Sequence, residues 1–166
     1  MRKQIAFISI LSVALILLGG CRKSLKDFSF YYTIESVNNY KLALTLGSDK
    51  TYKIEQYNYF MDNHANRQAP IITEGAITDR EYDEVVKHLS ACNFFRMKDT
   101  YGFDKESTED ATANILYQIT FRTGGKEKYI SIRNSDSNLF PEPFIHLLKY
   151  TSNFLSAHSP AKGQEQ

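Results

Sequence analysis

Apolar and polar residues alternate along two stretches of this chain, each interrupted by turn residues. Runs rich in aromatic and β-branched residues bounded by Gly, Asn, Asp and Pro are typical of strands. The first stretch predicts strands at Phe28–Ser36, Tyr40–Leu46, Thr51–Met61 and Ile71–Ile77, with a polar loop at 62–70. The second predicts a hairpin of Ile115–Arg122 and Lys128–Asn134 around Thr123-Gly124-Gly125.

Two other segments carry apolar residues at a spacing of three and four, which predicts amphipathic helices. Thr78 followed by Glu81 has the pattern of a capping box, and the apolar stripe after it runs through Tyr82, Val85, Leu89 and Cys92. A thiol on such a stripe is expected to have a raised pKa and to be inert. Asn93 ends this helix, and Phe94, Phe95 and Met97 are expected to fold back into the core. Pro141-Glu142-Pro143 suits the first turn of the second helix, which continues to about Ala157.

This order of elements predicts an α+β fold. We expect an antiparallel sheet of about five to six strands with two amphipathic helices packed on one face, a two-layer sandwich. A content of 42% hydrophobic and 13% aromatic residues is sufficient for one core. Residues 28–158 are therefore expected to form a single domain, followed by a flexible tail at 159–166.

The apolar run Ile5–Leu18 follows Arg2 and Lys3 and ends at Leu18-Gly19-Gly20-Cys21. It is shorter than the ~20 residues of a membrane-spanning helix. The segment resembles the lipobox of bacterial lipoproteins. The resemblance implies that signal peptidase II removes residues 1–20, that a diacylglycerol is attached to the Cys21 sulfur, and that the new amino terminus is acylated. Residues 21–27 would then be a lipidated tether. The alternatives are an N-terminal transmembrane anchor and an ordinary secretory signal.

Cleavage would remove two basic residues and no acidic one, which leaves 18 Lys and Arg against 19 Asp and Glu, a net charge of −1. Such a balance argues against nucleic acid as a partner. With Cys21 lipidated, Cys92 has no second cysteine with which to form an intramolecular disulfide. We expect an outer-membrane location with the domain in the periplasm, because Asp does not follow Cys21 and no acidic run occurs there.

Several short motifs also resemble those of uncharacterised small lipoproteins of the Bacteroidota type. They are Ser48-Asp49-Lys50-Thr51-Tyr52, Gly75-Ala76-Ile77-Thr78, Asn93-Phe94-Phe95 with Asp99 and Tyr101 beyond it, and Gly124-Gly125-Lys126. The resemblance covers most of residues 42–155 and implies no activity, so no catalytic residue is carried over from it.

The sequence contains no motif of a serine hydrolase elbow, a His-Glu-x-x-His zinc site or a phosphate-binding glycine loop. We therefore expect no catalytic residues, no metal and no cofactor other than the lipid on Cys21. The acidic residues between Lys98 and Thr112 lack the regular spacing of a calcium loop and are interpreted as a solvated surface loop. A hydrolase with an unrecognised site stays open as an alternative.

Tyrosines are dense in the first half of the chain. Tyrosine is favoured at interfaces because one end is apolar and the other forms hydrogen bonds. The leading hypothesis is a membrane-tethered, non-enzymatic module that binds another envelope protein through a sheet face or edge. The candidate interaction surface comprises Tyr31, Tyr32, Tyr52, Tyr57 and Tyr59. Packing of these tyrosines between helices and sheet is an alternative. Binding of a small molecule or glycan is a second hypothesis, although the absence of Trp counts against a sugar-stacking platform.

Overall fold

The computed structural model describes residues 25, 27–36, 39–59, 69–103, 115–133 and 139–159. In chain order the elements are β1 (Phe28–Ser36), β2 (Tyr40–Gly47), β3 (Thr51–Asn58), β4 (Ile71–Ala76), α2 (Asp79–Ala91), the 3₁₀ helix η2 (Phe94–Arg96), β5 (Thr100–Tyr101), β6 (Ile115–Thr123), β7 (Lys126–Arg133) and α3 (Glu142–His158). The cleavage site and Cys21 lie outside the described residues.

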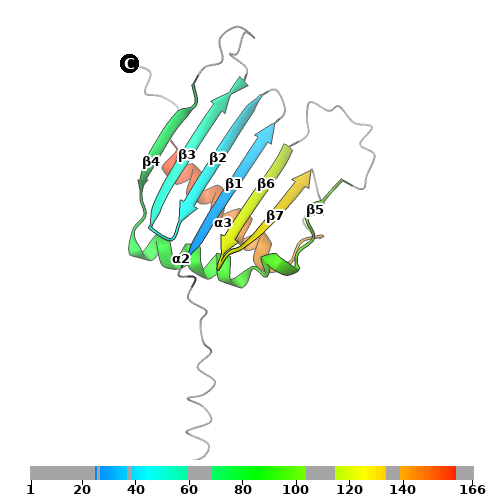
Figure 1. Ribbon diagram of the computed structural model, residues 1–166. Coiled ribbons are helices and arrows are strands. Elements are labelled where there is room, and N and C mark those ends of the chain that lie inside the picture. The colour runs from blue at the N-terminus through cyan, green and yellow to red at the C-terminus, as the bar shows by residue number, and fades with distance from the viewer. Residues whose placement is uncertain are drawn as a thin grey trace, which may run out of the picture.

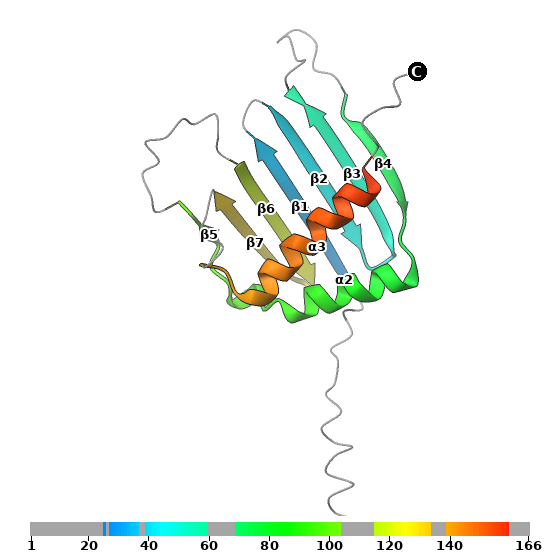
Figure 2. The ribbon, with the colours of Figure 1, turned by 180° about the vertical axis from the view of Figure 1, so that it is seen from behind.

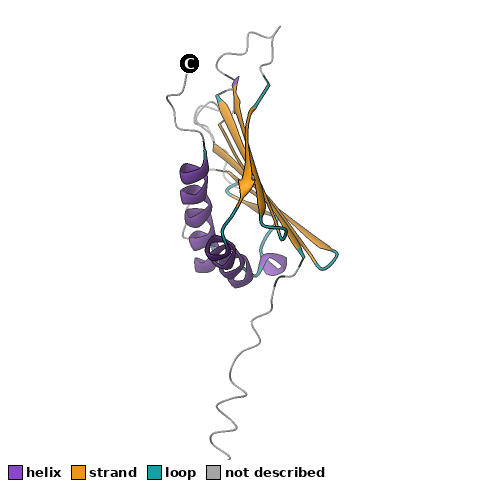
Figure 3. Ribbon diagram, turned by 90° about the vertical axis from the view of Figure 1, so that its left-hand side faces the viewer, coloured by secondary structure: helices purple, strands orange, loops and turns teal. Residues whose placement is uncertain are grey.

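The strands form one seven-stranded sheet in the order β4-β3-β2-β1-β6-β7-β5. Neighbouring strands are antiparallel except for β5, which pairs in parallel with β7. The α+β prediction is confirmed, and both helices pack on the same face of the sheet (Figures 1 and 3). The sheet is larger than the predicted five to six strands, because β5 lies in a segment that the sequence pattern assigned to a polar loop.

The core lies between the sheet and the two helices. On β1, alternate residues point to this side, and Phe28, Phe30 and Tyr32 are almost fully buried. The same alternation buries Leu44, Leu46 and Ile54 on β2 and β3, and Ile119, Phe121, Ile130 and Ile132 on β6 and β7. From the helices, Val85, Leu89, Phe144, Leu147, Phe154 and Leu155 complete the core. The inward-facing alternate residues of the strands therefore pack against the apolar stripes of the two helices, which recur with a period of 3.6 residues.

The α2 helix begins at the predicted capping box. The Glu81 backbone N–H donates to Thr78 Oγ1 at 3.3 Å, and the Thr78 backbone N–H donates to Glu81 Oε2 at 2.8 Å. The two helices also contact each other directly. Tyr150 on α3 donates from its hydroxyl to the Glu81 carbonyl at 3.3 Å, and the Cys92 thiol donates to the Pro143 carbonyl at 3.3 Å.

The strands end at two opposite sides of the sheet, which we call the near end and the far end. The near end carries Asp27, where the described chain joins the sheet, together with the turns at 47–50 and 124–125 (Figure 1). The far end carries Asn39 and Asn58, where β2 begins and β3 ends. The α2 helix lies along the near end, whereas α3 crosses the sheet obliquely towards the far end at β3 and β4 (Figure 2).

Two predictions about individual positions differ in outcome. The prediction that Phe94 and Met97 are core residues is confirmed, since they are 1% and 8% exposed. The prediction for Phe95 is wrong, since 43% of this residue is exposed. The reason is the 3₁₀ turn, in which Phe94 points into the sheet and its neighbour is directed away from the centre of the core.

Candidate functional site

One face of the sheet carries neither α2 nor α3, and in the described part of the chain no helix packs on it (Figure 3). We call it the open face. It is formed by the residues that alternate with the core positions: Ser29, Tyr31, Thr33 and Glu35 on β1; Lys41, Ala43 and Thr45 on β2; Lys53, Glu55 and Tyr57 on β3; Ile72 and Glu74 on β4; Leu116, Gln118, Thr120 and Arg122 on β6; and Glu127, Tyr129, Ser131 and Arg133 on β7.

The strand register aligns these residues in rows across the sheet. One row runs through Lys53, Thr45, Tyr31, Thr120 and Tyr129 on five neighbouring strands. The next row contains small side chains, Ala43, Thr33 and Ser131, which are at most 8% exposed although no helix of the described chain lies over them. The exposed residues of the open face are Ile72, Glu74, Arg122, Glu127 and Tyr129, whereas Tyr31 and Tyr57 are half-buried.

Six of the eight charged side chains on the open face form ion pairs with each other. Lys53 Nζ lies 3.1 Å from Glu55 Oε1, and this hydrogen bond raises the pKa of Lys53. Lys41 Nζ lies 4.0 Å from Glu35 Oε2 and 5.9 Å from the centre of the Tyr57 ring. Exposed pairs of this kind contribute little to stability, but they leave the face without a strong field of either sign.

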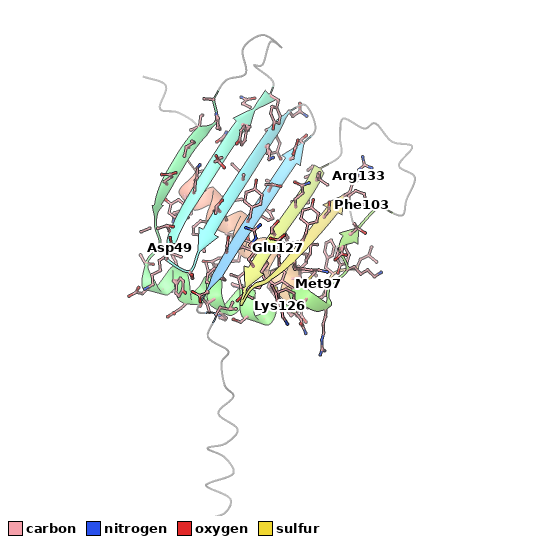
Figure 4. All side chains as sticks on the ribbon, viewed as in Figure 1. Asp49, Met97, Phe103, Lys126, Glu127 and Arg133 are labelled. Carbon is pink, nitrogen blue, oxygen red and sulfur yellow. The ribbon has the colours of Figure 1, made fainter. Side chains whose placement is uncertain are left out.

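At the β7 edge of the open face, two arginine side chains also have contacts. Arg122 forms an ion pair with Glu127 across the β6–β7 hairpin. The Arg133 guanidinium lies 5.8 Å from the centre of the Phe103 ring, a cation–π arrangement. Figure 4 looks onto this face, with Glu127, Arg133 and Phe103 labelled. Aromatic rings and paired charges therefore continue from β3 to β7.

The five tyrosines of the predicted interaction surface do not lie together. Tyr31 and Tyr57 are on the open face, where burial, followed by the charge of Glu55, raises the pKa of Tyr31. Tyr59 follows β3 and its ring centre is 6.3 Å from that of Tyr57. Tyr32 is 3% exposed in the core, and Tyr52 packs edge-on against Phe154 at 5.5 Å under α3. These last two contribute to the interior rather than to an exposed surface.

Sequence reasoning missed Tyr129, which is 45% exposed on the open face. Its strand was predicted to begin at Lys128, and Tyr129 alternates with the buried residues Ile130 and Ile132. That alternation was the signal that could have identified it as outward-facing. The tyrosines that the structure brings onto the open face are therefore Tyr31, Tyr57 and Tyr129.

The polar side chains of the open face are those of Ser, Thr, Tyr, Gln, Lys, Arg and Glu. None of its residues is a cysteine or histidine. Within the described ranges, no cluster of three or more metal-ligating side chains occurs and no helix is long and apolar enough to cross a membrane. Asp104, Glu106, Glu109 and Asp110 of the acidic segment lie outside the described residues.

Comparison of the chain with models of protein families gives no match, and comparison with curated proteins gives none at a significant score.

Proposed function

We propose that this protein is a lipid-anchored lipoprotein of the bacterial outer membrane whose domain is a non-enzymatic interaction module. The lipid on Cys21 would hold the domain at the membrane, and the open face would bind another envelope protein. The pattern Leu18-Gly19-Gly20-Cys21 supports the anchor. The domain is expected in the periplasm.

The observation that carries the proposed interaction is the composition of the open face. Tyr31, Tyr57 and Tyr129 present amphipathic rings on one face of the sheet, and Ile72 adds an apolar residue that is 50% exposed. Rigid aromatic side chains lose little conformational entropy on binding and are favoured at interfaces. Because the open face carries four basic and four acidic side chains, the partner is expected to present a polar, aromatic-rich surface without strong net charge.

The test is site-specific photo-crosslinking in the native membrane. A photoreactive amino acid is placed at Tyr129 or Tyr57 on the open face, and at the exposed His146 on α3 as the control. We expect the two open-face positions to give an adduct with the same envelope protein and His146 to give none. The substitution Y129A in the chain labelled at position 57 should reduce that adduct at least about tenfold, since central aromatic residues contribute ~2 kcal/mol or more to binding. Equal labelling from all three positions, or no effect of Y129A, would contradict the proposal.

A further inference from the structure

The surface expected of the partner is one that the open face itself has. It carries equal numbers of basic and acidic side chains, together with the rings of Tyr31, Tyr57 and Tyr129. The face extends over the six longer strands, which have six to nine residues each. At ~4.8 Å between strands and ~3.3 Å per residue it covers about 700 Å², close to the ~800 Å² per partner of a stable interface of standard size.

We propose that two copies of this chain pack open face against open face, related by a two-fold axis that runs parallel to the strands between β1 and β2. This inference rests on the proposed function, and it names the envelope protein that the open face binds as a second copy of the chain. Two stacked sheets keep their strands within about 30° of each other and lie ~10 Å apart. In this arrangement β1 of one copy lies over β2 of the other.

The charges nearest the axis carry the inference. Glu35 on β1 and Lys41 on β2 are opposite each other in the strand register, and Glu35 Oε2 lies 4.0 Å from Lys41 Nζ. The axis brings Lys41 of each copy over Glu35 of the other, so the two pairs form a square of alternating charge. An axis along β1 would instead bring Glu35 over Glu35, and an axis along β2 would bring Lys41 over Lys41. Because like charges that face each other across an interface are strongly unfavourable, the register selects the axis between the two strands.

The sizes of the side chains also fit this axis. The next row towards the near end contains Thr33 and Ala43, which are 0% and 2% exposed, so little side-chain surface keeps the two sheets apart there. In the row after it, Tyr31 of each copy lies over the smaller Thr45 of the other. Large side chains therefore face small ones on the two central strands.

The direction of the axis agrees with the proposed anchor. Both copies would be held at the bilayer by their near ends, where Asp27 joins the sheet (Figure 1). A two-fold axis parallel to the strands keeps the two near ends on the same side, whereas an axis across the strands would place them at opposite ends. In the same arrangement β4 lies over β7, so the exposed Ile72 and Tyr129 come from edges that face each other.

The experiment uses the full-length protein in its own membrane, as two populations that carry different C-terminal epitope tags. A photoreactive amino acid at position 129 of one population should give a dimer-sized adduct that carries both tags. An adduct with a different envelope protein, and none with both tags, would overturn this inference while leaving the proposed function standing. Absence of any adduct would overturn both.

Charge reversal tests the position of the axis. E35K makes the central pair of each copy basic and K41E makes it acidic, so either variant present alone should reduce the adduct with both tags at least about tenfold. When one population carries E35K and the other K41E, the facing charges are again opposite. The adduct should then return to within about threefold of the wild-type amount.

K87E is the matched control, because Lys87 forms an ion pair of 3.0 Å with Glu84 on α2, in the layer behind the sheet. It should leave the amount of adduct unchanged. Thermal melting establishes that each variant is folded. The inference is overturned if the mixture of E35K and K41E gives no more adduct than either variant alone, or if K87E reduces the adduct as much as they do.

Discussion

Two adjacent phenylalanines of η2 have opposite environments. Phe94 is 1% exposed, and its ring lies 4.5 Å from that of Phe121 and 6.3 Å from that of Phe144. Phe95 is 43% exposed. Because truncation of a buried aromatic residue leaves a cavity, we expect F94A to lower the free energy of unfolding by about 3–5 kcal/mol and F95A by less than about 1 kcal/mol. Denaturant unfolding of both variants checks this, and equal losses would contradict the assignment of Phe94 to the core.

Cys92 was predicted from its helical position to be buried and inert, and its burial is confirmed at 7% exposure. Burial raises the pKa of its thiol to about 12. Since only the thiolate is nucleophilic, the folded C21S protein should react with a disulfide reagent at pH 8 at least ~100-fold more slowly than the same protein unfolded in guanidinium. Absorbance of the released thiolate measures both rates. Rates within tenfold of each other would show that the thiol is accessible.

The α2 capping box links the stability of an element to pH. Hydrogen bonds from Thr78, first its hydroxyl and then its backbone N–H, lower the pKa of Glu81. A carboxyl whose pKa is lowered by folding stabilises the native state above its unfolded pKa, and this contribution is lost as pH falls through the folded pKa. E81Q should therefore be less stable than the wild type at pH 7, and the difference should close towards pH values below the lowered pKa of Glu81.

Melting temperatures of wild type and E81Q at several pH values between about 7 and 2.5 measure this difference. T78A provides the control, because it removes the first cause of the lowered pKa. T78A itself should cost about 1 kcal/mol at pH 7, and in its background the E81Q effect should be smaller. A wild-type advantage over E81Q that stays constant down to the lowest pH would contradict the argument.

At the level of elements, the sequence predicted most of the sheet because each long strand carries its own alternation and turn. The predicted bounds of β1 are those observed. In the β6–β7 turn, Gly124 and Gly125 have φ values of 54° and 73°, where residues with side chains are disfavoured. In contrast, β5 has two residues and depends on parallel pairing with β7, a long-range contact that no local period encodes.

The interaction surface was harder to predict for a related reason. Tyr31 and Tyr32 are consecutive, so in a strand one of them must face each side of the sheet. Which side is buried depends on where the helices pack, and local composition does not specify it. Gly75 is an example of a residue type that depends on such packing. The space beside Gly75 is filled by Tyr52, which packs under α3. A Cβ at position 75 would lie only 2.8 Å from the Tyr52 ring.

At the scale of the whole molecule, the open face and the proposed anchor occupy separate places. Residues 22–27 would reach at most about 20 Å from the lipidated Cys21 to β1, at ~3.3 Å per residue. The near end would therefore stay close to the bilayer, and the far end would point away from it. The open face runs from one end to the other, so a partner bound there would lie beside the domain rather than between it and the membrane.

This arrangement requires a lipid on Cys21, which leads to the last prediction. A single acyl chain binds a bilayer only marginally, at about 0.8 kcal/mol per buried methylene, whereas two or three chains make attachment effectively permanent. The wild-type protein should therefore sediment with the outer membrane and resist extraction by high salt. In C21S the protein should be lost from the outer-membrane fraction, and the melting temperature of the domain should be unchanged because position 21 precedes it.

Mass spectrometry of the mature protein separates this mechanism from its alternatives. A lipid-modified N-terminal peptide beginning at Cys21 is expected from the wild type. An uncleaved apolar segment would indicate a transmembrane anchor, and cleavage without a lipid would indicate an ordinary secretory signal.

C92S serves as the control for loss of a thiol as such. It should leave fractionation unchanged, because a thiol buried between α2 and α3 is not a substrate for lipid transfer. Retention of C21S in the outer-membrane fraction would contradict the anchor, whereas binding at the open face would remain testable in the domain without its lipid.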